Sequence, residues 1–168
     1  MVKSVPVVLG SRTLRLRSML GDHIIMCMLC IPVAMLLFPV IVKEAFYFML
    51  VPYLNKDFLQ GRSPAKRLVG LQVQDKSGAP ANELRAFLRN VTAMLWPVEV
   101  LLIALGSRKR LGDYVAGTQV VASPRTPSTH SWQQDLLAYQ VTSYTFYTLL
   151  ATLLYLLLLH GFFTWIGL

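Results

Sequence analysis

The sequence predicts an all-α membrane protein with three full transmembrane helices, one broken or re-entrant helical segment, and a small cytoplasmic cap containing a two-stranded β pairing. Three observations lead to this fold class. Hydrophobic residues make up 55% of the 168-residue chain, and the mean hydropathy of +0.53 is higher than a soluble domain carries. The apolar residues form runs that suit membrane passes. The 16 Lys and Arg lie in the gaps between these runs, as the positive-inside rule predicts.

The first predicted span covers residues 23–42 and follows a basic, cytoplasmic N-terminal segment at residues 1–22. Pro32 and Pro39 fall within the span, where prolines kink a helix. A second apolar run at residues 45–54 is short for a pass. It therefore has to borrow residues from its flanks, or the bilayer has to thin locally.

A polar and basic loop at residues 55–89 is expected on the cytoplasmic side. Within it, residues 68–74 alternate apolar and polar side chains and precede a turn, which indicates a short strand. Residues 117–122 form a second strand-like run that is expected to pair with the first. Residues 81–90 indicate the start of an amphipathic helix, with Asn82 as its N-cap.

The next apolar segment, residues 91–105, has Pro97 in its middle. A simple crossing would place the basic residues 108–110 opposite the basic loop, against the charge bias. A segment that is hinged at Trp96 and Pro97 and returns to the cytoplasmic side removes this conflict. Crossing and re-entry both stay open at the level of sequence.

After a linker at residues 123–135, the run at residues 136–168 is the clearest span, with Trp165 as an interfacial anchor. An aromatic stripe in this run suits either ordinary packing and membrane anchoring or the docking of a partner. Its members are Tyr139, Tyr144, Phe146, Tyr147 and Tyr155, of which Tyr144, Tyr147 and Tyr155 share approximately one helix face.

Three motifs occur in order along residues 10–122. Arg15 precedes Asp22 by seven residues, which places both on one helix face. The segment GRSPAKRLVGLQV begins at Gly61. Arg89 and Asn90 open the third apolar segment, and RLGDYVAGTQVV, which begins at Arg110, closes it. This set resembles the RDD family of bacterial integral membrane proteins, named for one arginine and two aspartates, which would be Arg15, Asp22 and Asp113.

The resemblance covers a membrane core at residues 23–122, including the basic loop, and leaves the last span outside. It implies a multi-pass protein of the bacterial inner membrane with a cytoplasmic N-terminus. Transport of ions or small solutes has been proposed for the family. Where the family has GQTLGKR, this chain has GRSPAKR at residues 61–67.

The candidate site residues are polar groups at or near the membrane entrance, where a buried carboxylate needs a partner. The polar residues of the family motif are Arg15, Asp22, Lys66, Arg67, Arg110 and Asp113. Asp22 and Asp113 either form structural ion pairs with Arg15, Arg17 or Arg110, or serve as cation or proton sites.

Glu99 is a further candidate for an ion or proton site, because no basic residue lies within eight positions of it. Its carboxyl group is expected either to be neutral or to face a polar cavity. The Pro97 break beside it would expose backbone carbonyls as additional ligands. The alternative is a glutamate at the interface that simply reaches water.

No cofactor, metal site or enzymatic activity is expected. Cys27 and Cys30 are the only two cysteines and lie within one apolar run, where packing explains them better than a redox or zinc pair does. The basic residues do not form a stripe suited to nucleic acid. The expected partners are anionic lipid headgroups at the basic loop, together with further copies of the chain or other membrane-protein subunits.

Two functions of different classes are compatible with these features. One is transport of ions or small solutes, with cation/proton exchange as one form of it, by a homo-oligomer, because so few helices do not enclose a pathway alone. The other is a non-catalytic accessory or scaffold subunit that docks in a larger membrane complex through its C-terminal helix.

Overall fold

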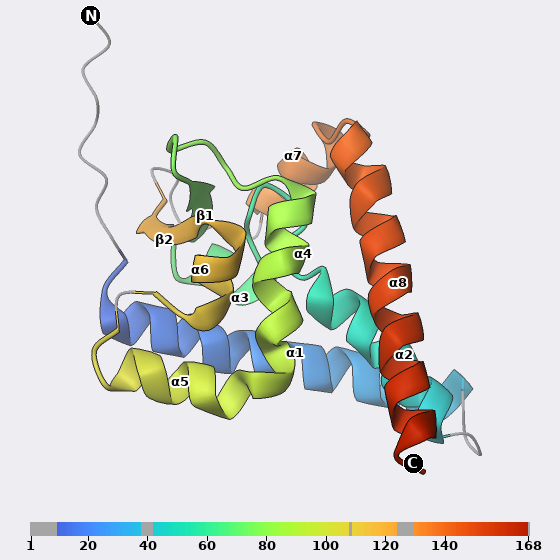
Figure 1. The fold of residues 1–168 in the computed structure, drawn as a ribbon. Helices are drawn as coiled ribbons and strands as arrows, with labels where there is room; N and C mark the ends of the chain where they lie inside the picture. The colour runs from blue at the N-terminus through green and yellow to red at the C-terminus, as the bar shows by residue number, and fades with distance from the viewer. Residues whose placement is uncertain (1–9, 38–41, 108, 124–129, 168) are drawn as a thin grey trace, which may run out of the picture.

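Long apolar helices and a small polar cap form the described part of the chain, which covers residues 10–37, 42–107, 109–123 and 130–167 of a computed structural model (Figure 1). The first two helices are α1 (Arg12–Leu37) and α2 (Val42–Leu54). The cap consists of α3 (Pro64–Leu68), β1 (Leu71–Asp75), α6 (Leu111–Ala116) and β2 (Thr118–Ala122). The bent segment comprises α4 (Glu83–Val91), the 3-10 turn η1 (Thr92–Leu95) and α5 (Trp96–Ala104). The last helices are α7 (His130–Leu137) and α8 (Ser143–Trp165).

Two helices of the described residues, α1 and α8, are long and apolar enough to cross a membrane, which is consistent with a membrane protein. The bent pair α4 and α5 forms a broken span or a re-entrant loop. Helix α2 has 13 residues and is therefore about 20 Å long, shorter than the ~30 Å hydrocarbon core. The expectation of three full spans is thus not confirmed.

Helix α1 starts at Arg12, and not at residue 23 where the span was predicted to begin. Its start is capped by Ser11, whose hydroxyl accepts the N–H of Leu14 at 3.3 Å. Residues 12–22 looked like a separate polar segment, but they continue the helix, with Arg15, Ser18 and Asp22 buried and Arg12 and Arg17 exposed. Pro32 lies inside α1, whereas Pro39 lies outside the described residues.

The bent segment turns by 93° between α4 and α5. The break is at η1, directly before the predicted hinge. Pro97 lies in the first turn of α5, where a helix makes no backbone hydrogen bond through the N–H that proline lacks. The end of α5 returns to the start of α1, because a Cβ added to Gly106 would lie 2.9 Å from Nη2 of Arg12. The predicted break in this segment is therefore present, and its bent course suits a broken span as well as a re-entrant loop.

The two predicted strands pair antiparallel, with Leu71 opposite Ala122 and Asp75 opposite Thr118. The pairing confirms the expected two-stranded cap, although β1 begins three residues later than predicted. Asn82 is the N-cap of α4, as expected, and its side chain accepts the N–H of Arg85 at 2.9 Å. The cap is joined to the start of α1 by a bond from the N–H of Gly10 to the carbonyl of Val120.

The predicted final span at residues 136–168 is divided between α7 and α8, and α8 begins only at Ser143. Residues 138–142 separate the two helices, and Thr142 is the N-cap of α8. Part of the predicted 123–135 linker is helical, since α7 starts at His130. Residues 124–129 lie outside the described part.

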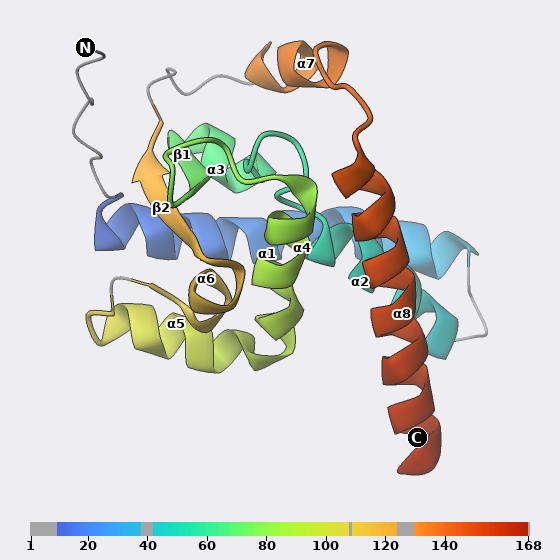
Figure 2. The same cartoon turned by 45° about the horizontal axis from the view of Figure 1, so that its top comes forward.

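Helix α8 packs against α4 and α2 of the same chain. The small core between them consists of Leu50, Leu54, Phe87 and Leu159. Tyr139 and Tyr155 of the predicted tyrosine stripe turn inward and donate to Glu83 Oε1 (2.9 Å) and the Val91 carbonyl (3.4 Å). Tyr144 and Tyr147 remain exposed. Figures 1 and 2 show α8 alongside α4 and crosswise to α1.

Candidate ionic site between helix α1 and the cap

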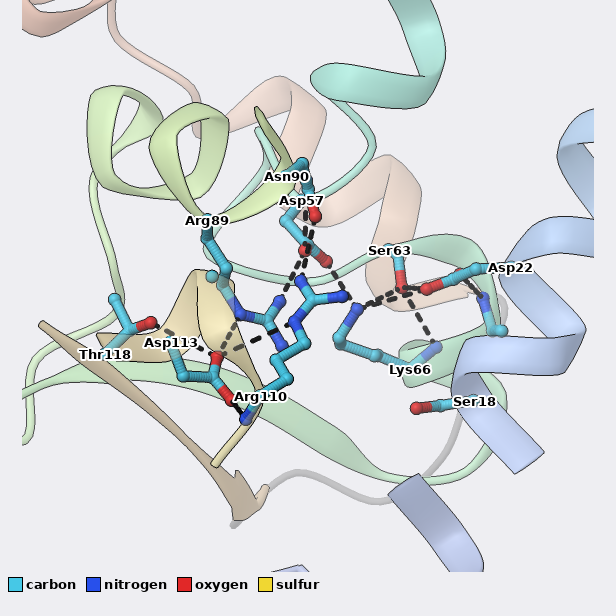
Figure 3. Close-up of polar contacts among 12 residues, drawn as sticks. Ser18, Asp22, Asp57, Ser63, Lys66, Arg89, Asn90, Arg110, Asp113 and Thr118 are labelled. Carbon is cyan, nitrogen blue, oxygen red and sulfur yellow. Dashed lines mark hydrogen bonds and ion pairs between the residues drawn. The ribbon is translucent and has the colours of Figure 1, made fainter. Parts of the chain in front are cut away.

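Eight charged side chains meet where α1 and α5 contact the cap, and we call this group the ionic cluster. Its members are Arg15, Asp22, Asp57, Lys66, Arg89, Glu99, Arg110 and Asp113, all of them buried. Figure 3 shows how most of these side chains point toward one another from different elements of the fold. Charges held in this way need partners, because an unpaired buried charge is very unfavourable.

One end of the cluster is built on the polar face of α1. Arg15, Ser18 and Asp22 are spaced by three and four residues and are all buried against the cap. This confirms that Arg15 and Asp22 share one helix face. They do not pair with each other, however, because Arg15 binds Asp113 at 3.2 Å and Asp22 binds the α3 region.

Asp22 is held by the start of α3. Its carboxylate accepts the hydroxyl of Ser63 at 2.7 Å and the N–H of Ala65 at 3.1 Å. Ser63 is also the N-cap of α3. Gly21 lets the two elements approach, since a Cβ there would lie 3.1 Å from Cβ of Ala65. The predicted arginine partners of Asp22 are therefore replaced by Ser63 and Lys66, and Arg17 is exposed.

The ammonium group of Lys66 lies in a cage of three oxygens. Nζ is 3.1 Å from Asp22 Oδ2, 2.8 Å from Asp57 Oδ1 and 3.0 Å from Ser63 Oγ. An ammonium has three N–H donors, so each can meet one oxygen. We call this arrangement the Lys66 cage.

Asp57 connects the Lys66 cage to the rest of the cluster. Its side chain has no exposed surface and accepts Nη1 of Arg89 at 2.6 Å and Nδ2 of Asn90 at 3.4 Å. Burial alone would raise the pKa of Asp57, but the charges of Lys66 and Arg89 outweigh burial and hold this pKa below its ordinary value. Asp57 is therefore a carboxylate at neutral pH.

Asp113 is the second fully buried carboxylate and sits in the first turn of α6. It accepts Nε of Arg89 at 2.5 Å, Nη2 of Arg15 at 3.2 Å and the backbone N–H of Arg110 at 3.2 Å. Burial would raise the pKa of Asp113, but Arg89 and Arg110 lower it overall. The close approach of α6 to α4 requires Gly112, because a Cβ there would overlap the carbonyl oxygen of Arg89.

Glu99 is buried at the other end of the cluster and has three partners. It accepts Nη1 of Arg110 at 3.4 Å, the hydroxyl of Thr92 at 2.6 Å and the N–H of Gly112 at 3.2 Å. The expectation of a carboxyl group without a basic neighbour is corrected here, because Arg110 is eleven residues away in sequence but adjacent in space. Arg110 also donates to Oδ1 of Asn90 at 2.9 Å.

Among the remaining predicted site residues, Arg67 lies apart from the cluster and pairs with Asp135 of α7 at 2.7 Å. Cys27 and Cys30 are free thiols. In the described residues, no group of three or more His, Cys, Asp and Glu side chains is placed to hold a metal ion.

Asp57, at the centre of the cluster, was not among the residues predicted from the sequence. Its position directly after the apolar run of α2, beside Asn55 and Lys56, was the available signal. A carboxylate placed where a chain leaves a membrane helix needs a partner, as Asp22 does. No family model, no curated protein and no solved structure matches this chain.

Proposed function

We propose that this membrane protein transports ions or small solutes and that its reaction is the exchange of a monovalent cation for a proton. The observation that carries this proposal is the Lys66 cage, in which two buried carboxylates and one hydroxyl surround a single positive charge. The resemblance to the RDD family, for which such transport has been proposed, supports it as well.

The cage suits exchange because one alkali cation can replace one proton of Lys66 without changing the net charge of the cage. Carboxylate and hydroxyl oxygens are the ligands that hard cations prefer. When the ammonium of Lys66 releases a proton, the oxygens of Asp22, Asp57 and Ser63 are left with an uncompensated negative charge. A Na⁺ or K⁺ ion that enters then restores the balance, so that one cation is taken up for each proton released.

The broken segment beside the cluster also favours a transport role. Interrupted helices are the usual places where membrane transporters expose backbone groups near an ion site. Here the break at η1 begins with Thr92, whose hydroxyl donates to Glu99. Glu99 and Asp113, which both pair with Arg110, are the further candidate ion sites in this proposal.

The expected assembly is a homo-oligomer in the bacterial inner membrane, with a cytoplasmic N-terminus. A single copy has too few spanning helices to enclose a pathway, so we propose that the pathway runs between copies. The exposed apolar face of α8, which carries Leu150, Leu154 and Leu158, would face lipid or a neighbouring copy.

A second candidate function is that of a non-catalytic subunit of a larger membrane complex. It is favoured by the completeness of the cluster, because each of its four carboxylates is bound by protein donors within the described residues. A permanent clasp between α1 and the cap would have the same geometry. Since α8 packs on its own chain through one face, only its outer face would be free for docking.

The two candidates are separated by measuring how cations affect thermal stability. The purified chain is heated in detergent with NaCl, KCl or an impermeant organic salt at equal ionic strength, at pH 7 and pH 9. Exchange predicts that one alkali cation raises the melting temperature and that this effect is larger at pH 9 than at pH 7, because cation binding and proton binding compete. Lys66→Gln should abolish the pH dependence, while Lys76→Gln, which changes an exposed lysine, should keep it.

The transport assay follows on the same preparation in proteoliposomes with an imposed pH gradient. Cation-dependent dissipation of the gradient that is lost in Lys66→Gln supports exchange. The absence of any cation effect on stability and flux, together with a stoichiometric partner in the particle purified from its native membrane, would refute exchange and favour the subunit.

A further inference from the structure

A cavity of about 300 Å³ lies between α1, α2 and the first residue of α5. Its wall is almost entirely apolar, and α1 contributes the residues from His23 to Ile31, while α2 contributes those from Phe46 to Tyr53. Trp96 closes one side. None of these groups takes part in the ionic cluster, so the cavity is a separate feature of the fold.

The dimensions of the cavity suit a single hydrocarbon chain. Its volume corresponds to on the order of ten water-sized groups. The stretch of α1 from His23 to Ile31 rises by about 12 Å, so the cavity is elongated along the helix. Ile31 and Phe46, at the end away from the cluster, are partly exposed, which leaves that end open to a surrounding lipid phase.

The opposite end of the cavity is polar and aromatic. The hydroxyl of Tyr53 is 3.5 Å from Nδ1 of His23, and the His23 ring stacks on Trp96 with the centroids 4.7 Å apart. Nε1 of Trp96 is buried and has no acceptor among the described residues. An indole N–H usually finds a partner when it is buried, and a ligand oxygen at this end would supply one.

Lys56 stands at this polar end. Its Nζ lies 4.0 Å from the centroid of the Tyr53 ring, and no carboxylate lies within ion-pair distance of it among the described residues. The ionic cluster does not supply one, because its four carboxylates are already matched by four cationic side chains. Lys56 is therefore a surplus positive charge next to the mouth of an apolar cavity.

Burial makes the charged form of Lys56 unfavourable. Burial lowers the pKa of Lys56 to about 7, and the nearby carboxylate of Asp22 offsets only part of this effect. An anion beside the ammonium would favour its charged form. The Lys56 residue as a whole is only partly buried.

We propose that the cavity holds one acyl chain of an anionic phospholipid, with the lipid phosphate bound by Lys56 and the ester region beside Tyr53 and Trp96. The proposal is independent of transport, since it uses none of the cluster residues. Its occupant is identified by two complementary features: a narrow apolar cavity for a hydrocarbon chain and a surplus cation for a phosphate.

The test uses Trp96 as a reporter inside the cavity wall. The chain has three tryptophans, and the other two, Trp132 and Trp165, are exposed and are changed to Phe. This protein is reconstituted into phosphatidylcholine vesicles that contain rising fractions of phosphatidylglycerol with brominated acyl chains. Bromine in contact with the indole quenches its fluorescence. Brominated phosphatidylcholine in phosphatidylglycerol-free vesicles gives the baseline for lipid without a net charge.

The expected result is half-maximal quenching at about a fivefold lower fraction of brominated phosphatidylglycerol than of brominated phosphatidylcholine, as one basic side chain near a membrane surface provides. Lys56→Gln should remove this preference, and Lys56→Arg should keep it. Lys109→Gln is the matched control, because Lys109 also lies over a tyrosine ring, at 5.9 Å from Tyr114, away from the cavity.

Equal quenching by the two lipids in the parent protein would overturn the proposal without any lysine variant. A preference that survives in Lys56→Gln, or that disappears equally in Lys109→Gln, would also overturn it, because general surface charge would then explain the attraction. Size-exclusion profiles of all variants establish that the comparison is between folded proteins. If Lys56→Gln does not fold, two measurements remain. The parent protein must prefer brominated phosphatidylglycerol to brominated phosphatidylcholine, and Lys56→Arg must retain this preference; otherwise the proposal is wrong.

Discussion

The central role of Asp57 can be tested by replacing it with asparagine. The change keeps the shape of the side chain but removes the charge that Lys66 and Arg89 share, at 2.8 and 2.6 Å. Removing one partner of a buried ion pair usually costs about 3–5 kcal/mol. Lys66 retains Asp22 and Arg89 retains Asp113, so we expect the lower end, about 3 kcal/mol.

For a chain of this size, a loss of about 3 kcal/mol corresponds to a drop in melting temperature of roughly 6–12 °C. The assay is thermal unfolding of the purified protein in a mild detergent at pH 7, followed by circular dichroism. Asp75→Asn is the matched control, because Asp75 forms a partly exposed ion pair with Arg85 at 3.7 Å, and the amide oxygen of asparagine can still accept a hydrogen bond from Ser77 or Ala79. Exposed pairs contribute about 1 kcal/mol or less, so the control should lose no more than about 4 °C.

Comparing the wild type with Asp57→Asn at different pH values gives a second test. The pKa of Asp57 is lower in the folded chain than its ordinary value of 3.8, so its contribution is present above that value and is lost as the pH falls through the folded pKa. The gap in melting temperature between the wild type and Asp57→Asn should therefore shrink below pH 4. A gap of less than about 2 °C at pH 7, or an equal loss in Asp75→Asn, would refute the assignment of Asp57 as the centre of the cluster.

Gly112→Ala should destabilise the fold by several kcal/mol, since its Cβ would meet the Arg89 carbonyl, whereas Gly161→Ala, with nothing within 4 Å, should be neutral. Melting temperatures compare the two variants, and equal values contradict the packing of α6. Because burial lowers the pKa of Lys56 to about 7 from 10.5, the unfolded chain binds more protons between these values, and stability should rise from about pH 7 to about pH 9.5. An unchanged slope in Lys56→Met would contradict this. Cysteines placed at Ser107 and Gln74, in a variant without Cys27 and Cys30, should label from the same side of the membrane, and labelling from opposite sides would show that residues 91–105 cross.

Local patterns made much of the fold predictable. The alternation of residues 68–74 and the run at residues 117–122 were enough for the paired strands, and the position of Asn82 was enough for a helix cap. The charge bias around residues 91–105 indicated the bent course. These signals depend either on residues close together in sequence or on the general charge bias of membrane proteins. A single sequence is therefore enough to detect them.

The cluster was only partly predictable because its pairs are distant in sequence. Arg15 binds a carboxylate 98 residues away, and no spacing rule connects the two. Asp57 went unrecognised for the same reason, and Glu99 was taken for an isolated group. The division of the last apolar run was missed because residues 138–142 contain only two clearly polar residues, Gln140 and Thr142, within a long apolar stretch, although the backbone leaves the helix there.

The seven-residue spacing of Arg15 and Asp22 on α1 determines how membrane voltage would act on the ionic cluster. Helix α1 is long and apolar enough to cross a membrane, and seven residues rise by about 10 Å along its axis. A charge that crosses the whole membrane gains about 2.3 kcal/mol per 100 mV. A proton or cation that moves from the Lys66 cage toward Asp113, parallel to a membrane-crossing α1, would cover about a third of the ~30 Å hydrocarbon core, and it would therefore gain at most about a third of that energy.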